Sequence, residues 1–197
     1  MLGIAEELEH QPMTRRLAAL AILAVAGLAV AGSARAAAPF DLADFFAGSS
    51  QSAGEVRTLL VFREAFTATF TGRRDGERLR LDERFAFRDG ARLQRWDLTQ
   101  RGAEISGTVE TELGDGTLAA PVPVAGTRTP IGAVLTYRGH APGGGATLFG
   151  FRHEMTANTD GTVSNHVSVT KFGLPVATSD VTFAKSAAAL AAHLPRP

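Results

Sequence analysis

The sequence predicts an all-β protein, an antiparallel barrel of about eight to ten strands with a short helical plug near its N-terminus. Apolar segments with period-two alternation follow one another closely, and turn sequences such as Asp89-Gly90 and Asp160-Gly161 separate them. No strand–helix–strand rhythm interrupts the series. A single meander with bulky residues on one face favours a closed barrel, because closure also removes exposed sheet edges.

The composition fits one domain without thiol chemistry. The 197 residues include 20 Lys+Arg and 20 Asp+Glu, so the formal net charge is zero. A neutral chain without charge runs disfavours nucleic acid or an anionic lipid surface as the main partner. The chain contains no cysteine, which excludes disulfides and argues against a lipid-modified N-terminal cysteine.

Residues 1–36 have the order of an export signal. Arg15-Arg16 precede an apolar run over residues 17–31, and small residues follow up to Ala36. This order predicts a signal peptide cleaved after Ala36, a periplasmic or secreted protein, and no stable transmembrane span after cleavage. Acidic residues near the start are unusual in such a signal, so translation begins either at Met1 or, as we hypothesise, at Met13.

The expected barrel domain covers residues 39–185 and begins with a helical turn. Asp41 is a suitable N-cap, Gly48 ends the turn, and the apolar residues between them suit a plug for one end of a barrel. These apolar residues are Phe40, Leu42, Phe45 and Phe46. The Ala-rich residues 186–197 form either a short helix or a frayed tail.

Strands are expected wherever the alternation is clear. After the polar residues 49–55 they cover residues 56–71, a hairpin over 79–98, and residues 104–113, 131–139, 147–158, 163–171 and 174–184. Residues 117–125 are expected to form an edge strand or a loop, because Pro121 and Pro123 donate no backbone hydrogen bond.

Glu83 is the most informative residue of the 79–98 hairpin, because it shares a face with Leu81 and Phe85. A buried carboxylate is costly unless it is paired. If Asp89-Gly90 is a two-residue turn, Trp96 lies opposite Glu83, whereas a loop one residue longer places Arg95 there and allows a buried ion pair. Glu83 is therefore either a paired acid that fixes strand register or a ligand contact.

Two further pairs have weaker chemical signals. Glu64 lies on the same face of the preceding strand and would form an acid–base dyad with Glu83 if the two carboxyls were close. His153 and His166 flank Asp160-Gly161 and would be diagonal neighbours, roughly 7–8 Å apart. We expect solvated or core histidines there rather than a metal site. No nucleotide-binding or nucleophile motif occurs, so we expect no cofactor and assign no catalytic residue.

Several motifs together are similar to the domain of unknown function family 3833. They are Phe-Phe-Ala-Gly at 45–48, F-T-x4-G-x6-L-x-L-x-E-x-F-x-F-x-D-G from Phe66 to Gly90, Arg95-Trp96, Ile105-Ser-Gly-Thr, and Asn165 with Lys171-Phe-Gly. The resemblance implies a bacterial envelope protein with a lipocalin-like (calycin-type) barrel, and it implies no established activity. The chain departs from the family pattern at residues 152–155 and at His166, where a family site would be altered.

We therefore expect an exported barrel that binds an apolar or amphipathic small molecule, such as a lipid or fatty acid, against its inward phenylalanines. The candidate ligand contacts are Glu83, Phe85, Arg95, Trp96, Phe66, Asn165 and Lys171, with Lys171 near an opening. Two alternatives stay open. One is an enzyme of modified lipids with Glu83 as acid or base, and the other is a filled barrel with a structural role in the envelope. The oligomeric state is left open.

Overall fold

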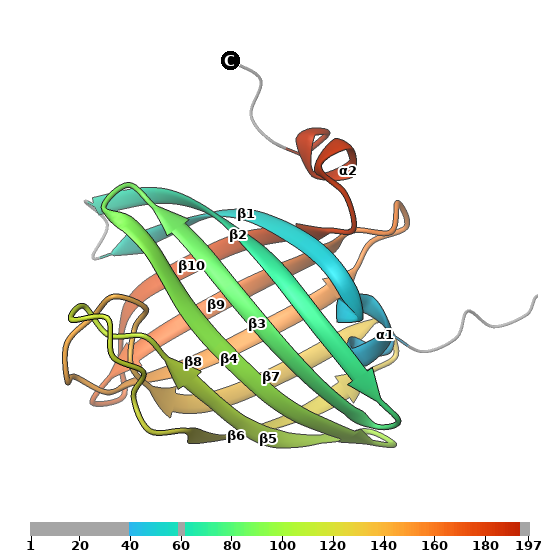
Figure 1. Cartoon of the computed structure of the whole chain (residues 1–197), viewed down its shortest axis with the longest axis horizontal. Coiled ribbons are helices and arrows are strands. Elements are labelled where there is room, and N and C mark those ends of the chain that lie inside the picture. The colour runs from blue at the N-terminus through green and yellow to red at the C-terminus, as the bar shows by residue number, and fades with distance from the viewer. Residues whose placement is uncertain (1–39, 59–61, 194–197) are drawn as a thin grey trace, which may run out of the picture. The chain divides into compact units, whose positions relative to one another are not determined.

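The computed structural model describes residues 40–58 and 62–193, which form a closed barrel of ten antiparallel strands (Figure 1). The strands are β1 (Gly48–Thr58), β2 (Phe62–Asp75), β3 (Arg78–Phe87), β4 (Gly90–Arg101), β5 (Glu104–Thr111), β6 (Val122–Thr129), β7 (Gly132–Gly139), β8 (Phe149–Ala157), β9 (Val163–Lys171) and β10 (Leu174–Ala184). Each strand pairs with its neighbours in the chain, and β1 pairs with β10 to close the circle. The predicted class is confirmed, with the strand number at the upper end of the expected range. The predicted signal segment and its cleavage site lie outside the described residues.

The predicted plug is present as helix α1 (Leu42–Phe46). The Asp41 side chain accepts a hydrogen bond from the Asp44 backbone N–H at 2.9 Å, as an N-cap does. The ring of Phe46 lies 5.4 Å from that of Phe70 and 5.3 Å from that of Phe183, measured between centroids. Helix α1 therefore closes the end of the barrel where β1 begins and β10 ends, which we call the plug end (Figure 1).

The prediction of one strand over residues 56–71 is wrong, because this segment belongs to two antiparallel strands. Residues 49–55, expected to precede the first strand, lie within β1. The inward side chains of β1 are small, with Ser50 and Ser52 fully buried, so the strand lacks an apolar alternation. Gly54 pairs with Phe66, and a Cβ at Gly54 would lie 3.0 Å from the Phe66 ring. A small residue is therefore needed at Gly54 of β1, because the bulky ring of Phe66 on the neighbouring strand packs against this position.

The register of the predicted hairpin differs from both alternatives considered. Arg88 and Asp89 form the turn, and Phe87 pairs with Gly90, the first residue of β4. Because of this pairing, Gly90, which has φ +138°, follows the turn and is not part of it. Glu83 is consequently paired with Gln94, and neither Trp96 nor Arg95 lies directly opposite it.

The uncertain proline segment contributes a full barrel strand. Strand β6 pairs with β5 and β7, so it is not an edge strand, and it begins only at Val122. Pairing with β7 starts at Val124, which leaves Pro123 paired on the β5 side alone. The proline therefore lies where one neighbour is missing, in agreement with its lack of an N–H.

A short helix, α2 (Ala187–Ala191), follows the last strand. Ser186 caps it, because its hydroxyl accepts a hydrogen bond from the Ala189 N–H at 3.2 Å. Its Leu190 side chain is buried. Of the two forms expected for the Ala-rich segment, the helix is the one observed. Within residues 40–58 and 62–193, no helix is long and apolar enough to cross a membrane.

Candidate functional site

A cavity of about 530 Å³ occupies the interior of the barrel. It reaches Leu42 and Phe46 of α1 at the plug end. At the opposite end, which we call the mouth, it is lined by the exposed Phe62 and by Lys171. Binding pockets for small molecules usually have volumes of about 300–1,000 Å³, so this cavity is large enough for a ligand.

Aromatic rings form two facing parts of the cavity wall. On β2 and β3, the rings of Phe66, Phe85 and Phe87 lie 5.4 to 5.7 Å apart. On β7 and β8, Tyr137 stacks on Phe151 at 4.8 Å. These strand pairs are five strands apart in a ten-stranded barrel, so the two clusters lie on opposite sides of the cavity. A ligand between them would contact apolar rings on both sides.

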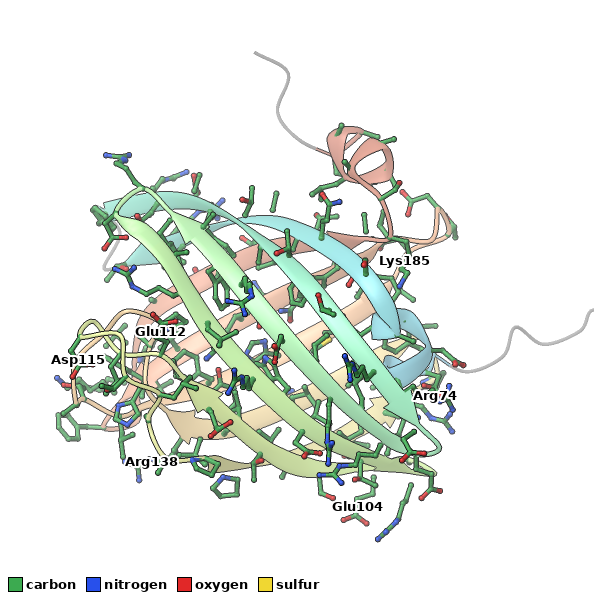
Figure 2. All side chains as sticks on the ribbon, viewed as in Figure 1. Arg74, Glu104, Glu112, Asp115, Arg138 and Lys185 are labelled. Atoms are coloured by element: carbon green, nitrogen blue, oxygen red, sulfur yellow. The ribbon has the colours of Figure 1, made fainter. Side chains whose placement is uncertain are left out.

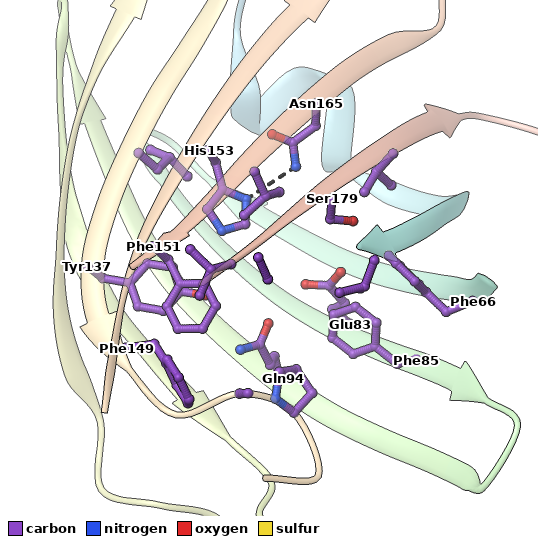
Figure 3. Close-up of a pocket in the computed structure, with 18 of the residues that line it drawn as sticks. Phe66, Glu83, Phe85, Gln94, Tyr137, Phe149, Phe151, His153, Asn165 and Ser179 are labelled. Carbon is purple, nitrogen blue, oxygen red and sulfur yellow. Dashed lines mark hydrogen bonds between the residues drawn. The ribbon is translucent and has the colours of Figure 1, made fainter. Parts of the chain in front are cut away.

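A group of polar side chains interrupts this apolar wall at mid-height, and we call it the polar belt. Its members are Glu83, Gln94, Trp96, Tyr137, His153, Asn165 and Ser179, all of which line the cavity. His153 is the middle residue of β8 and Ser179 is the middle residue of β10. Figure 3 shows Glu83, Gln94, His153, Asn165 and Ser179 directed into the same space.

Glu83 is buried in this belt without a cation. The Trp96 indole Nε1 donates a hydrogen bond to Glu83 Oε2 at 3.0 Å, and no ion pair involves Glu83 in the described part of the chain. Burial raises the pKa of Glu83 to about 8, and the Trp96 hydrogen bond only partly opposes this shift. At neutral pH Glu83 is therefore mostly a neutral carboxylic acid, which can donate a hydrogen bond as well as accept one.

His153 and its neighbours have unused hydrogen-bonding capacity. Asn165 Nδ2 lies 3.2 Å from His153 Nδ1, and burial lowers the pKa of His153 to about 4, which keeps the ring neutral. With the amide as donor, Nδ1 accepts and Nε2 carries the ring proton. Three buried atoms at the cavity have no partner among the described residues: His153 Nε2, Asn165 Oδ1 and Ser179 Oγ.

Most of the site residues predicted from sequence line the cavity. Glu83, Phe85, Trp96, Phe66 and Asn165 lie inside it, and Lys171 lies at the mouth. The Lys171 amine is 5.6 Å from the ring of Phe172 and 5.9 Å from that of Phe149. The predicted residues therefore come together in one cavity, with one exception.

Arg95 is that exception, and its prediction as a cavity contact is wrong. It projects from the outer face of β4, where its Nε lies 3.5 Å from Asp82 Oδ1 on β3. Neighbouring residues of a strand point to opposite faces, so the inward position of Trp96 requires Arg95 to point outward. The predicted ion pair of Arg95 with Glu83 is therefore absent.

The two weaker pairs are also separated. Glu64 lines the mouth side of the cavity, but it is six residues from Phe70, the partner of Glu83, or ~20 Å along the strand. His166 faces outward, with Nδ1 2.7 Å from Asp180 Oδ1, while His153 faces inward. The reason is a five-residue loop over 158–162, longer than the predicted two-residue turn. Among the described residues, no three His, Asp or Glu side chains are grouped to hold a metal ion.

Sequence reasoning missed three members of the polar belt, namely Gln94, Tyr137 and Ser179. Gln94 lies two residues before Trp96 on β4, and Ser179 lies two residues before Val181 on β10, so each pair points to the same face of its strand. Both are polar residues in an inward apolar row, the same signal that identified Glu83. Serine and glutamine give a weaker form of this signal than a carboxylate does, because their burial costs less.

One family model covers the part of the chain that forms the barrel. A family model described as a protein of unknown function (DUF3833) matches residues 19–185, a range that includes α1 and all ten strands. No curated protein matches the sequence. The matched range contains the cavity and the whole polar belt. The chain therefore belongs to the DUF3833 family of proteins of unknown function.

Proposed function

We propose that this protein is an exported carrier that binds a lipid, a fatty acid or another amphipathic small molecule in the cavity of its barrel. The observation that carries this proposal is the cavity of about 530 Å³ that runs from α1 to the mouth. A barrel of this kind has room for one small ligand when side chains leave its interior unfilled. Such a volume speaks against a filled barrel with a purely structural role.

The lining of the cavity supports this class of ligand. Facing phenyl rings and aliphatic side chains suit an acyl chain or a ring system, whose burial is favourable by roughly 25 cal/mol per Å² of apolar surface. Lys171 is the one Lys or Arg among the described lining residues, and it lies at the mouth. A ligand with an acidic end group would therefore place that group near Lys171 and its apolar body in the barrel.

Export to the bacterial envelope is part of the proposal and has separate support. It rests on the charged, apolar and small-residue order of residues 1–36. N-terminal sequencing of the protein recovered outside the cytoplasm tests it, with a mature chain starting at Ala37 as the expected result. A mature start before Ala34 would contradict the predicted cleavage.

Ligand binding can be measured with the protein's own fluorescence. Trp96 is the single tryptophan and borders the cavity, with 6% of its surface exposed. Titration with octadecanoate should change its emission in a saturable way, and the replacement Val167→Phe, which adds bulk to the lining without adding a tryptophan, should weaken the binding. Ile131→Phe serves as the matched control, because Ile131 is exposed and does not line the cavity. Saturable binding that Val167→Phe leaves unchanged would place the ligand elsewhere.

Native mass spectrometry of protein purified from its own envelope would show whether a lipid is retained. One bound lipid is the expected result, and a barrel that is empty in every preparation and binds no added lipid would contradict the proposal.

Glu83 favours one alternative, an enzyme of modified lipids. A protonated carboxyl group in an apolar cavity is suited to general acid catalysis. The lipids extracted with wild-type protein and with Glu83→Gln distinguish the two functions. A carrier predicts the same lipid in both, whereas an enzyme predicts that the product is replaced by its precursor in the variant.

A further inference from the structure

We infer that the ligand of this cavity carries an oxygen function, most simply a hydroxyl group, partway along its apolar chain and not only at its end. This inference rests on the proposed binding of a lipid-like molecule and specifies its chemical class. It comes from the position of the polar belt within the cavity and from the buried atoms there that have no partner.

The polar belt lies between two apolar parts of the same cavity. Toward the mouth the wall is formed by Phe66, Phe87 and Phe149. Toward α1 it is formed by Leu42, Phe46 and neighbouring aliphatic residues. A plain acyl chain that fills the cavity would therefore press methylene groups against the polar belt, where hydrogen-bonding groups would stay unpaired.

The unpaired atoms indicate which hydrogen-bonding group the ligand presents to the polar belt. Asn165 and Ser179 are 3% and 7% exposed, and Asn165 Oδ1 and Ser179 Oγ have no partner among the described residues. His153 Nε2, a donor when Nδ1 accepts from Asn165, also has none. Buried polar groups in proteins are normally paired, so a set of three on one cavity indicates a missing partner. A hydroxyl group both donates and accepts, and it can satisfy Asn165 Oδ1 together with a neighbouring donor.

The belt is unsuited to an ionic head group. No Lys or Arg of the described residues lines it, and an ionised group placed there would be buried without a counter-charge. Lys171 provides that charge at the mouth. Ser179 pairs with Val167, four residues from Lys171 and so ~13 Å away along β9. The arrangement suits a fatty acid with its carboxylate at Lys171, its mid-chain oxygen at the polar belt and its tail at α1.

Three octadecanoates test this class directly. One is unsubstituted, one carries a hydroxyl near the middle of the chain, and one carries it at the far end. Titration of Trp96 fluorescence, checked by calorimetry, gives the three dissociation constants. The mid-chain hydroxy acid should bind about fivefold more tightly than the other two, since a net hydrogen bond in a buried site contributes on the order of 1 kcal/mol.

Ser179→Ala links the preference to the belt. It removes one hydroxyl with little change in volume, and it should lower the preference for the mid-chain hydroxy acid over octadecanoate about threefold. Ser52→Ala is the matched control, because Ser52 is also a buried serine without a partner but does not line the cavity. The control should keep the full preference, and thermal melts establish that both variants fold.

The outcomes separate this inference from the proposed function. Equal affinities for the three acids, or a preference for the terminal hydroxyl, would overturn the inference while leaving lipid binding intact. A mid-chain preference that Ser179→Ala and His153→Leu both leave unchanged would also overturn it. No binding of any of the acids would contradict the proposed function itself.

Discussion

The two ends of the barrel use apolar residues in different ways. At the plug end, Phe46 packs on Phe70 and Phe183, and Gly72 leaves room for α1, since a Cβ there would lie 1.9 Å from the Phe46 carbonyl oxygen. Lys185 donates hydrogen bonds to the carbonyl oxygens of Phe45 and Ala47 at 2.9 and 2.8 Å. Helix α1 is thereby fixed by packing and by capping at its C-terminus.

The mouth leaves large apolar side chains in solvent instead. Phe62, Phe172 and Leu174 are 57%, 92% and 68% exposed, and Leu118 and Leu148 lie in the loops of the same end. Figure 2 shows Arg74 and Lys185 beside α1, whereas Glu112 and Asp115 lie at the mouth. The difference indicates that the plug end holds the fold together and that the mouth is free to serve binding. Changes at the plug end should therefore affect stability, and changes at the mouth should affect ligand binding.

The largest stability loss is expected for Phe46→Ala at the plug end. The substitution removes a fully buried ring and leaves a cavity, so the free energy of unfolding should fall by ~3–5 kcal/mol in urea denaturation. Phe62→Ala at the mouth is the counterpart and should change stability by less than about 0.5 kcal/mol, because Phe62 is already exposed. Comparable losses at both positions would remove the distinction between the ends.

Glu83 lies between the two ends, and its contribution to the free energy of unfolding depends on pH. Its pKa is raised from 4.5 to about 8, so the folded protein keeps a proton that the unfolded chain releases, and stability falls as pH rises from 4.5 to 8. The pKa of His153 is lowered from 6.5 to about 4, so its contribution to stability rises with pH up to 6.5. The two slopes oppose each other up to pH 6.5, and only the Glu83 slope remains above it.

Glu83→Gln should remove the Glu83 slope and leave that of His153. Between pH 4.5 and 8, the free energy of unfolding of the variant should rise by about 2–4 kcal/mol relative to that of the wild type. This is less than the full pKa shift implies, because Glu83 borders the cavity. Denaturation series at several pH values check this difference. A difference that does not vary with pH would show that Glu83 does not titrate in the folded protein within this window.

Lys185 and Lys171 form a matched pair, one at each end. Lys185→Met should lower the free energy of unfolding by about 1 kcal/mol, because two carbonyl oxygens at the C-terminus of α1 lose their donor. Lys171→Met should leave stability unchanged and weaken the binding of octadecanoate about tenfold, with less effect on a neutral alcohol of the same length. Denaturation and Trp96 titrations measure the two effects, and reversed roles would contradict the comparison.

The smallest expected effect has the opposite sign and concerns the turn between β9 and β10. Phe172 has φ +53° and is followed by Gly173 at φ +81°, a turn conformation that favours Asn-Gly. Phe172→Asn should therefore stabilise the fold by up to about 1 kcal/mol, because asparagine tolerates this φ and the lost ring was in solvent. A lower melting temperature for this variant would show that the Phe172 ring supports the fold.

Local patterns made much of the fold predictable. Strands β9 and β10 agree with the prediction to the residue, and the Asp41 cap correctly located α1, because alternation and capping depend on near neighbours. The β3–β4 register was not predictable, because it depends on where Arg88 and Asp89 turn. A shift of one residue there moved Gln94 opposite Glu83.

The site was predictable only where a residue conflicted with its surroundings. Glu83 was found because a carboxylate in an apolar row is costly. Ser179 has the same placement, but Ser50 and Ser52 are also inward and buried without lining the cavity, so an inward serine does not by itself identify a site. The prediction for Arg95 is wrong because consecutive residues of a strand point to opposite faces, so Arg95 and Trp96 cannot both line the cavity.

The most direct test of binding in the cavity is the quenching of Trp96 by fatty acids that carry a spin label at different positions. Trp96 belongs to the polar belt at mid-height, so a ligand that enters with its carboxylate at Lys171 brings a mid-chain label closest to the indole. Saturable quenching, strongest for the mid-chain label and abolished by unlabelled octadecanoate, is the predicted result. Quenching that is absent, or equal for all label positions and insensitive to the competitor, would contradict it.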